Sequence, residues 1–232
     1  MSRRLTFLFL LCAVCVPAVM ADIVYENINS PFFNSAIQPR RALDDGFFYQ
    51  NPGDFSLPIL VDQAAFGFQV TGTDVASLDV KLTFYGGMNP AADPVNSNPL
   101  GSFVVPFTNI SPGAVMTSLM PLPSAILFPG NSWGVEFEFL EPGTNTLSTR
   151  GTVLFAGSDP NGPTVGWSED TYWRDANLDA LYSPVEARWF GDGSNRANFY
   201  LQLNGRMVDP IPEPATLALL GFGVLPMLRR RK

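Results

Sequence analysis

The fold class of this chain is decided by two segments, LDVKLTFY at residues 78–85 and WGVEFEF at residues 133–139. Apolar side chains occupy the even positions of the first segment and the odd positions of the second. Successive side chains of an extended strand point to opposite faces, so each segment is expected to form a strand with one apolar and one polar face.

Similar but shorter patterns recur along the rest of the chain. The chain holds 20 Gly and 21 Pro, and only 15% of its residues are charged, a composition that suits short strands joined by turns. We predict an all-β fold of roughly eight to ten strands, an antiparallel β-sandwich of jelly-roll type, over residues 22–208. Further candidate strands lie at residues 23–25, 47–49, 66–70, 102–107, 115–119, 151–155 and 199–203.

The first 21 residues have the features of a secretory signal peptide. Two arginines, Arg3 and Arg4, precede an apolar run that ends before Pro17, and small residues follow it. The run is too short to span a bilayer, so we expect cleavage between Ala21 and Asp22 by signal peptidase.

Cysteine and histidine chemistry is excluded from the mature protein. Both cysteines, Cys12 and Cys15, lie in the predicted leader, and the chain contains no histidine. Disulfides, cysteine nucleophiles, histidine-based catalytic triads and histidine-ligated metal sites are therefore ruled out.

The C-terminal segment, residues 209–232, has three parts. A proline-rich spacer contains Pro212, Glu213 and Pro214, an apolar stretch runs from 215 to 228, and four basic residues close the chain. The stretch is apolar on all sides and is expected to be a short transmembrane helix. The basic residues, which fix the cytoplasmic end, are Arg229, Arg230, Arg231 and Lys232.

This segment closely resembles the PEP-CTERM sorting signal of Gram-negative bacteria, in which the tripeptide Pro-Glu-Pro precedes a short apolar helix and a basic cluster. The resemblance implies processing near Pro212–Pro214 by exosortase, a membrane-embedded cysteine transpeptidase. It also implies a location in the cell envelope or at the surface, and an association with exopolysaccharide.

The charge of the central region limits its partners. Residues 22–213 contain all 21 acidic residues but only eight of the 14 basic ones, which gives a net charge of −13. Such a domain is not expected to bind nucleic acid, because binding requires neutralisation of phosphates.

The segment 133–139 also carries a candidate catalytic pair, Glu136 and Glu138. With Glu141 these residues resemble the Glu-x-Asp-x-x-Glu signature of laminarinase-like glycosidases, although Glu138 stands where that family has Asp. The resemblance implies a glycoside hydrolase with two carboxylates at the scissile bond. We instead interpret Glu136 and Glu138 as the solvent-exposed face of an amphipathic strand, and keep the hydrolase as the alternative.

A long loop region, residues 157–194, holds the remaining candidate sites. Its oxygen-bearing side chains suit calcium in type but follow no fixed calcium motif, so no cofactor is assigned and a calcium-dependent carbohydrate-binding module stays an alternative. The candidate calcium ligands are Asp159, Asn161, Asp170 and Asp175. Three tryptophans of this region, Trp167, Trp173 and Trp189, are expected to cover the core, and Trp133 to lie within it.

Taken together, the sequence predicts a non-enzymatic, exported envelope protein that exosortase sorts. Its β-sandwich would have a structural or exopolysaccharide-associated role. The expected partners are signal peptidase, exosortase, the membrane and an extracellular polysaccharide.

Overall fold

The computed structural model describes residues 21–28, 31–32, 40–48, 57–88, 99–156, 163–169, 171–189 and 198–208. These residues form β-strands and one short 3-10 turn, η1 (Pro184–Glu186), so the all-β, antiparallel part of the fold prediction is confirmed. Within these ranges no helix is long and apolar enough to cross a membrane. The predicted leader up to residue 20 and the predicted tail from residue 209 lie outside them.

The first sheet is built around its longest strand. Its order is β1-β14-β4-β10, and β7 and β8 also pair with β4. The strands are β1 (Asp22–Asn27), β4 (Ile59–Val70), β7 (Gly113–Met116), β8 (Met120–Phe128), β10 (Gly151–Val153) and β14 (Leu201–Met207).

The second sheet has the order β13-β12-β3-β9-β5-β6. A separate pair joins β2 (Pro31–Phe32) to β11 (Phe155–Ala156). The strands of the second sheet are β3 (Arg41–Phe47), β5 (Val75–Gly86), β6 (Pro99–Ile110), β9 (Ser132–Leu140), β12 (Tyr172–Arg174) and β13 (Ala187–Arg188).

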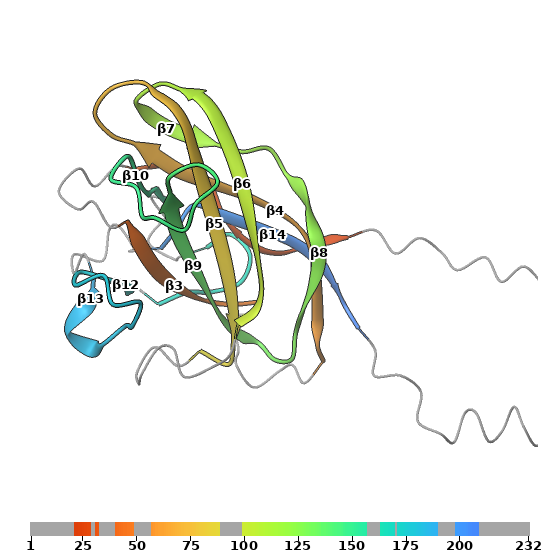
Figure 1. Ribbon diagram of the computed structural model, residues 1–232. Coiled ribbons are helices and arrows are strands. Elements are labelled where there is room, and N and C mark those ends of the chain that lie inside the picture. Colours follow the sequence, from red (N-terminus) through yellow and green to blue (C-terminus); the bar gives the residue numbers. More distant parts are fainter. Residues whose placement is uncertain are drawn as a thin grey trace, which may run out of the picture.

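The strand order is that of a jelly roll. The four strands β1-β14-β4-β8 of the first sheet pack against β3-β9-β5-β6 of the second (Figure 1). Along the chain these eight strands alternate between the two sheets, except that β5 and β6 form a hairpin within one sheet. This alternation is the double Greek-key arrangement of the eight-stranded jelly roll.

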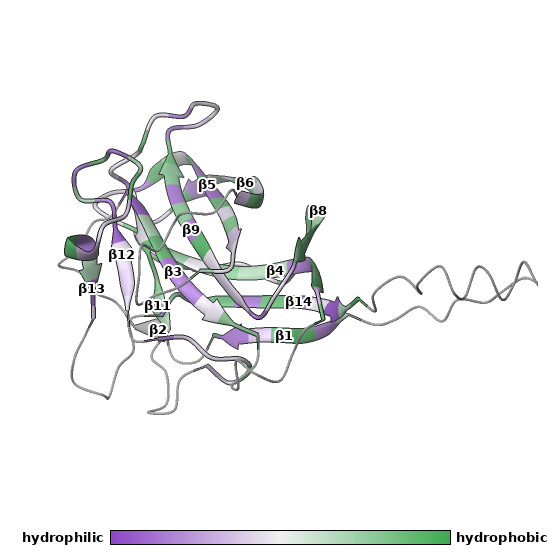
Figure 2. Cartoon of the chain, turned by 90° about the horizontal axis from the view of Figure 1, so that it is seen from below, coloured by the Kyte–Doolittle hydropathy of each residue, from purple (hydrophilic) through white to green (hydrophobic). Residues whose placement is uncertain are grey.

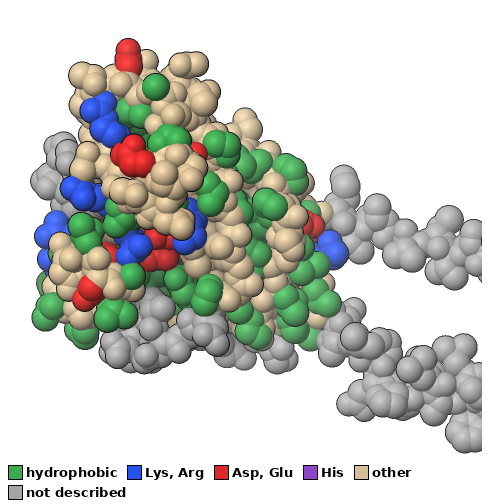
Figure 3. Space-filling model, in the orientation of Figure 1, with side chains coloured by type: hydrophobic (Ala, Val, Ile, Leu, Met, Phe, Trp, Pro, Cys, Tyr) green, Lys and Arg blue, Asp and Glu red, His purple; other side chains and the backbone are tan. Residues whose placement is uncertain are grey.

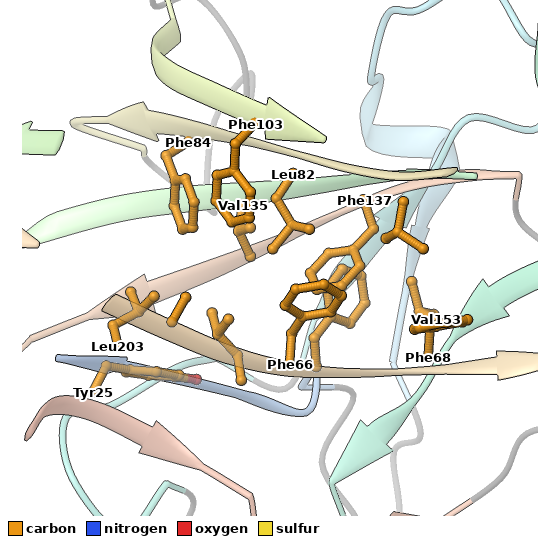
Figure 4. Close-up of a cluster of buried hydrophobic side chains, with 14 of the residues drawn as sticks. Tyr25, Phe66, Phe68, Leu82, Phe84, Phe103, Val135, Phe137, Val153 and Leu203 are labelled. Carbon is orange, nitrogen blue, oxygen red and sulfur yellow. The ribbon is translucent and has the colours of Figure 1, made fainter. Parts of the chain in front are cut away.

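Aromatic side chains fill the space between the two sheets (Figure 4). Phe66 and Phe68 of β4 face β9, where their ring centroids lie 5.8 Å from Phe137 and 6.1 Å from Phe139. The apolar positions that the alternation predicted in 78–85 and 133–139 are buried, including Trp133. Both cysteines of the chain, Cys12 and Cys15, lie before β1, so apolar packing rather than disulfides holds the sandwich together.

The two ends of the domain lie on the same side of the sandwich. Asp22, the first residue of β1, pairs with Gly205 near the end of β14. In Figure 1 the start of β1 and the end of β14 lie at the right, and β12 and β13 lie at the left; the view from below in Figure 2 shows the same separation. A partner that binds at β12 and β13 therefore approaches the side away from the chain ends.

Candidate functional site

Five charged side chains meet on the outer face of the second sheet, and we call this group the ionic cluster. Arg41 lies on β3, Lys81 on β5, and Glu136 and Glu138 on β9, while Asp175 follows β12. The strand register brings them together, because Arg41 and Lys81 both pair with Glu138, one from each side. The polar faces of three neighbouring strands thus converge on the middle strand.

Glu136 and Glu138 are buried, at 6% and 5% exposure, so their interpretation as a solvent-exposed face is wrong. The physical reason is that residues 171–189, which we call the covering segment, shield both glutamates from solvent. Its strand β12 extends the sheet beyond β3, and the residues after β12 fold back over the outer face. There Trp173 and Tyr182 pack with Leu43 in a second apolar cluster.

Glu138 is fully paired with cations. Its Oε1 accepts hydrogen bonds from Arg41 Nε at 3.0 Å and Nη2 at 2.7 Å, and Lys81 Nζ donates to its Oε2 at 2.5 Å. Burial by itself would raise the pKa of Glu138, but the hydrogen bonds and charges of Lys81 and Arg41 lower it below the ordinary glutamate value. Glu138 is therefore held as a carboxylate.

Glu136 has mainly neutral partners. Tyr182 donates to its Oε1 at 2.7 Å and Tyr85 to its Oε2 at 3.0 Å, whereas Arg41 Nε lies 3.6 Å away. Burial raises the pKa of Glu136, and the neighbouring charge of Glu138 adds to this, while the two tyrosine hydrogen bonds and Arg41 oppose it. The two neighbouring glutamates thus differ in the direction of their pKa shifts.

Asp175 links the cluster to the covering segment. Its Oδ2 accepts from Arg41 Nη1 and from the backbone N–H of Ala180, both at 3.0 Å, and its Oδ1 accepts from the N–H of Asp179 at 3.1 Å. Glu186 acts similarly, because it accepts from the N–H of Ala176 and of Ser183. These carboxylates close the turns of the segment.

The calcium candidates do not come together in the part of the chain that the structure describes. Asp175 is bonded within the ionic cluster, and Asp159, Asn161 and Asp170 lie outside the described residues. Among the described residues no group of three or more Asp, Glu, Cys or His side chains is placed to hold a metal ion. The calcium site stays a prediction.

The four tryptophans differ in how far they are buried. Trp133 and Trp173 are each 1% exposed, as expected for residues that cover or fill the core. Trp167 is half-buried and packs on Phe47, with ring centroids 4.9 Å apart. Trp189, at the end of the covering segment, is 67% exposed, so the prediction that it covers the core is wrong.

Sequence reasoning missed Arg41 and Lys81, which compensate the buried glutamates. A signal was present for Lys81, because it is the single lysine between residues 22 and 213 and lies on the polar face of 78–85. No local signal marks Arg41, because its partners lie 97 and 134 positions away in the chain.

A second buried acidic pair lies next to the cluster on β3. Asp44 accepts from the N–H of Phe199 at 2.7 Å and of Asp45 at 3.0 Å. Asp45 accepts from the N–H of Glu169 at 3.1 Å through Oδ2, but its buried Oδ1 has no hydrogen-bond partner. Burial raises the pKa of Asp45 to about 7, with the charge of Glu169 adding and the backbone hydrogen bonds opposing.

The comparisons with known proteins identify the C-terminal segment. Residues 210–232 match the family model of the PEP-CTERM protein-sorting motif. The resemblance of this segment to the PEP-CTERM sorting signal is therefore confirmed. No curated protein and no solved structure matches the chain.

Replacement of Arg41 tests the ionic cluster. Arg41→Gln leaves Glu138 and Asp175 buried with less compensation, and we expect it to lower the free energy of unfolding by about 3 kcal/mol. Urea denaturation measures the change. Arg206→Gln is the matched control, because Arg206 forms a more exposed pair with Asp62 and should change stability by less than about 1 kcal/mol. Equal effects of the two substitutions would show that the cluster is not stabilising.

Asp45 makes stability depend on pH. Its pKa of about 7 in the folded state lies above the ordinary value of 3.8. At a pH between these two values the folded protein keeps a proton on Asp45 that the unfolded chain has released. Stability should therefore fall as the pH rises from about 4 to about 7, by at most about 4 kcal/mol from this group. Urea denaturation at pH 5 and pH 8 measures the difference. Asp45→Asn should flatten this slope, and an unchanged slope would contradict the assignment.

Proposed function

We propose that this protein is an exported envelope protein that exosortase sorts through Pro212-Glu213-Pro214. Signal peptidase removes the leader between Ala21 and Asp22. The apolar stretch 215–228 and the basic residues 229–232 then hold the chain in the membrane before processing. The sandwich has a structural or exopolysaccharide-associated role and no catalytic activity of its own.

The match of residues 210–232 to the sorting motif is the observation that carries this proposal. It begins just after β14 ends at Met207, so the sorting segment follows the last strand of the sandwich directly. The domain is therefore held close to the membrane while the tail is inserted. At the other end, β1 begins at Asp22, which agrees with cleavage before this residue.

The ionic cluster supports a structural role for the sandwich. The four carboxylate oxygens of Glu136 and Glu138 each accept a hydrogen bond from Arg41, Lys81, Tyr85 or Tyr182. A buried network whose members are satisfied rigidifies a fold. It fastens a surface segment to the sheet, which suits a protein that must persist outside the cell without disulfides.

Mass spectrometry of the protein from envelope and medium tests the proposal. We expect Asp22 as the first residue and a new C-terminus near Pro212. Glu213→Ala should keep the tail and hold the protein in the membrane fraction, because exosortase no longer reads the tripeptide. Glu141→Ala, which removes an exposed glutamate elsewhere, is the control and should be processed normally. A full-length cytoplasmic species, or normal processing of Glu213→Ala, would overturn the proposal.

A secreted glycoside hydrolase is the second candidate function. It is favoured by the opposite pKa shifts of Glu136 and Glu138, since a glycosidase needs one protonated and one ionised carboxyl. In this reading Glu136 is the acid and Glu138 the nucleophile or base. Catalysis would require both to leave their present hydrogen bonds.

A β-glucan hydrolysis assay decides between the two functions. The hydrolase hypothesis expects release of sugar by the native protein, with a loss of at least about 100-fold in Glu136→Gln and in Glu138→Gln. The structural role expects no release by any of the three proteins. Loss of stability in the variants is followed by urea denaturation, so that unfolding is not mistaken for a catalytic defect.

A further inference from the structure

Two buried polar groups on β12 lack partners. Tyr172 is 1% exposed, and its hydroxyl makes no hydrogen bond. Two residues further along the strand, the buried Nε of Arg174 also has none. Buried polar atoms are normally satisfied, and each orphan costs free energy comparable to a lost hydrogen bond. Unpartnered donors that lie close together indicate a place for an acceptor from outside the chain.

The strand register gathers three donors on one face. Arg174 and Tyr172 are separated by one residue on β12 and point the same way, and Arg188 on β13 pairs directly with Tyr172. Burial raises the pKa of Tyr172 to about 12, whereas the charges of Arg174 and Arg188 act to lower it. Both guanidinium groups are thus within electrostatic reach of the phenol.

Neither Arg174 nor Arg188 is neutralised by an acidic side chain of the described residues. Arg188 Nη1 donates to the backbone oxygens of Val185 at 3.0 Å and Ala187 at 2.6 Å, which hold the side chain in place. Neither Arg174 nor Arg188 is part of an ion pair within the described residues. Asp44 also faces Tyr172, but its two oxygens accept backbone hydrogen bonds.

The position of these groups contrasts with the charge of the domain. Residues 22–213 carry a net charge of −13, and on the left of Figure 3, the side of β12 and β13, basic side chains lie among acidic ones. An anionic polymer is repelled by an acidic surface, but Arg174 and Arg188, which form no ion pair within the described residues, can attract it. This side also faces away from the chain ends, so the membrane-held tail leaves it open.

We propose that Tyr172, Arg174 and Arg188 form an oxyanion-binding site for the carboxylate of an acidic polysaccharide. The planar guanidinium groups match the geometry of a carboxylate, and the phenol adds a neutral donor. The hydroxyl of Tyr172 and the Nε of Arg174 are both closed to solvent in this structure, so the side chains around them must move apart before the bound oxygens reach them. Inorganic phosphate has the same acceptor chemistry and serves as a small probe. The choice of a polysaccharide rests on the proposed function.

Thermal unfolding of residues 22–232, the chain without its predicted leader, tests the site. The probes are inorganic phosphate, polygalacturonate as an acidic polymer, and dextran as a neutral one. The melting temperature should rise with phosphate and with polygalacturonate but not with dextran. Arg174→Gln and Arg188→Gln should each weaken the apparent affinity about tenfold or more, the effect of losing one charge-assisted hydrogen bond. Arg206→Gln, on the side of the chain ends, should leave it unchanged.

Tyr172→Phe separates ligand binding from a general loss of stability. Without anion this variant should melt at or above the temperature of the native protein, because it removes an orphaned hydroxyl. With anion it should gain less than the native protein does. A variant that only damages the fold would melt lower in both conditions, and that result would overturn the proposal.

Three other results have defined meanings. Equal anion effects in the native protein, Arg174→Gln and Arg206→Gln would show nonspecific binding and overturn the site. If Arg174→Gln and Arg188→Gln are destabilised and no protein responds to anion, the arginines pair with an acid of the chain itself. That result also overturns the proposed site. A response to phosphate but not to polygalacturonate overturns the polysaccharide. Correct processing of the termini together with no anion effect would leave the proposed function standing and remove the site alone.

Discussion

The guanidinium group of Arg41 joins three buried carboxylates, those of Glu136, Glu138 and Asp175. It binds Glu138 through two nitrogens and Asp175 through a third, and it lies 3.6 Å from Glu136. Removing charges from water is costly, and such a cluster persists only if its geometry supplies hydrogen bonds in return. Asp175 belongs to the covering segment. Arg41, which neutralises Glu138 on β9, therefore also fixes residues 171–189 on the sheet through its ion pair with Asp175. The location of β12 and β13, and of the three donors on them, follows from this attachment.

The alternation of apolar residues predicted the two sheets of the sandwich, but not that residues 171–189 cover the outer face of the second sheet. The strands at 78–85 and 133–139 were predictable because one face of each meets the opposite sheet. The exposure of Glu136 and Glu138 was not, because a segment more than 30 residues further along the chain covers them. Strand β3 was not predicted for a related reason. Both of its faces are buried, and the acidic pair Asp44 and Asp45 breaks the alternation of apolar and polar residues that marks a strand in the sequence. β8 contains Pro121 and Pro123, which argue against a strand in sequence and are tolerated because it lies at a sheet edge.

The sorting motif and the binding site also differ in how far they can be predicted from sequence. A sorting motif is read along the chain, so Pro212-Glu213-Pro214 and the segments after it could be recognised from residue order alone. A binding site on a jelly roll is assembled from strands that are distant in sequence. The ionic cluster draws on four elements, and Tyr172, Arg174 and Arg188 come together only through the pairing of β12 with β13. Neither arrangement leaves a fixed spacing that a sequence pattern could identify.

Native-state hydrogen exchange in Arg41→Gln tests most directly whether the ionic cluster holds the covering segment. The amides of Asp179 and Ala180 donate to Asp175, which Arg41 pairs. If the cluster fixes the segment, their protection should fall by at least about tenfold in the variant, while the amide of Leu82 in the core strand β5 falls only as far as global stability does. Unchanged protection at Asp179 and Ala180, or an equal loss at all three amides, would contradict the account.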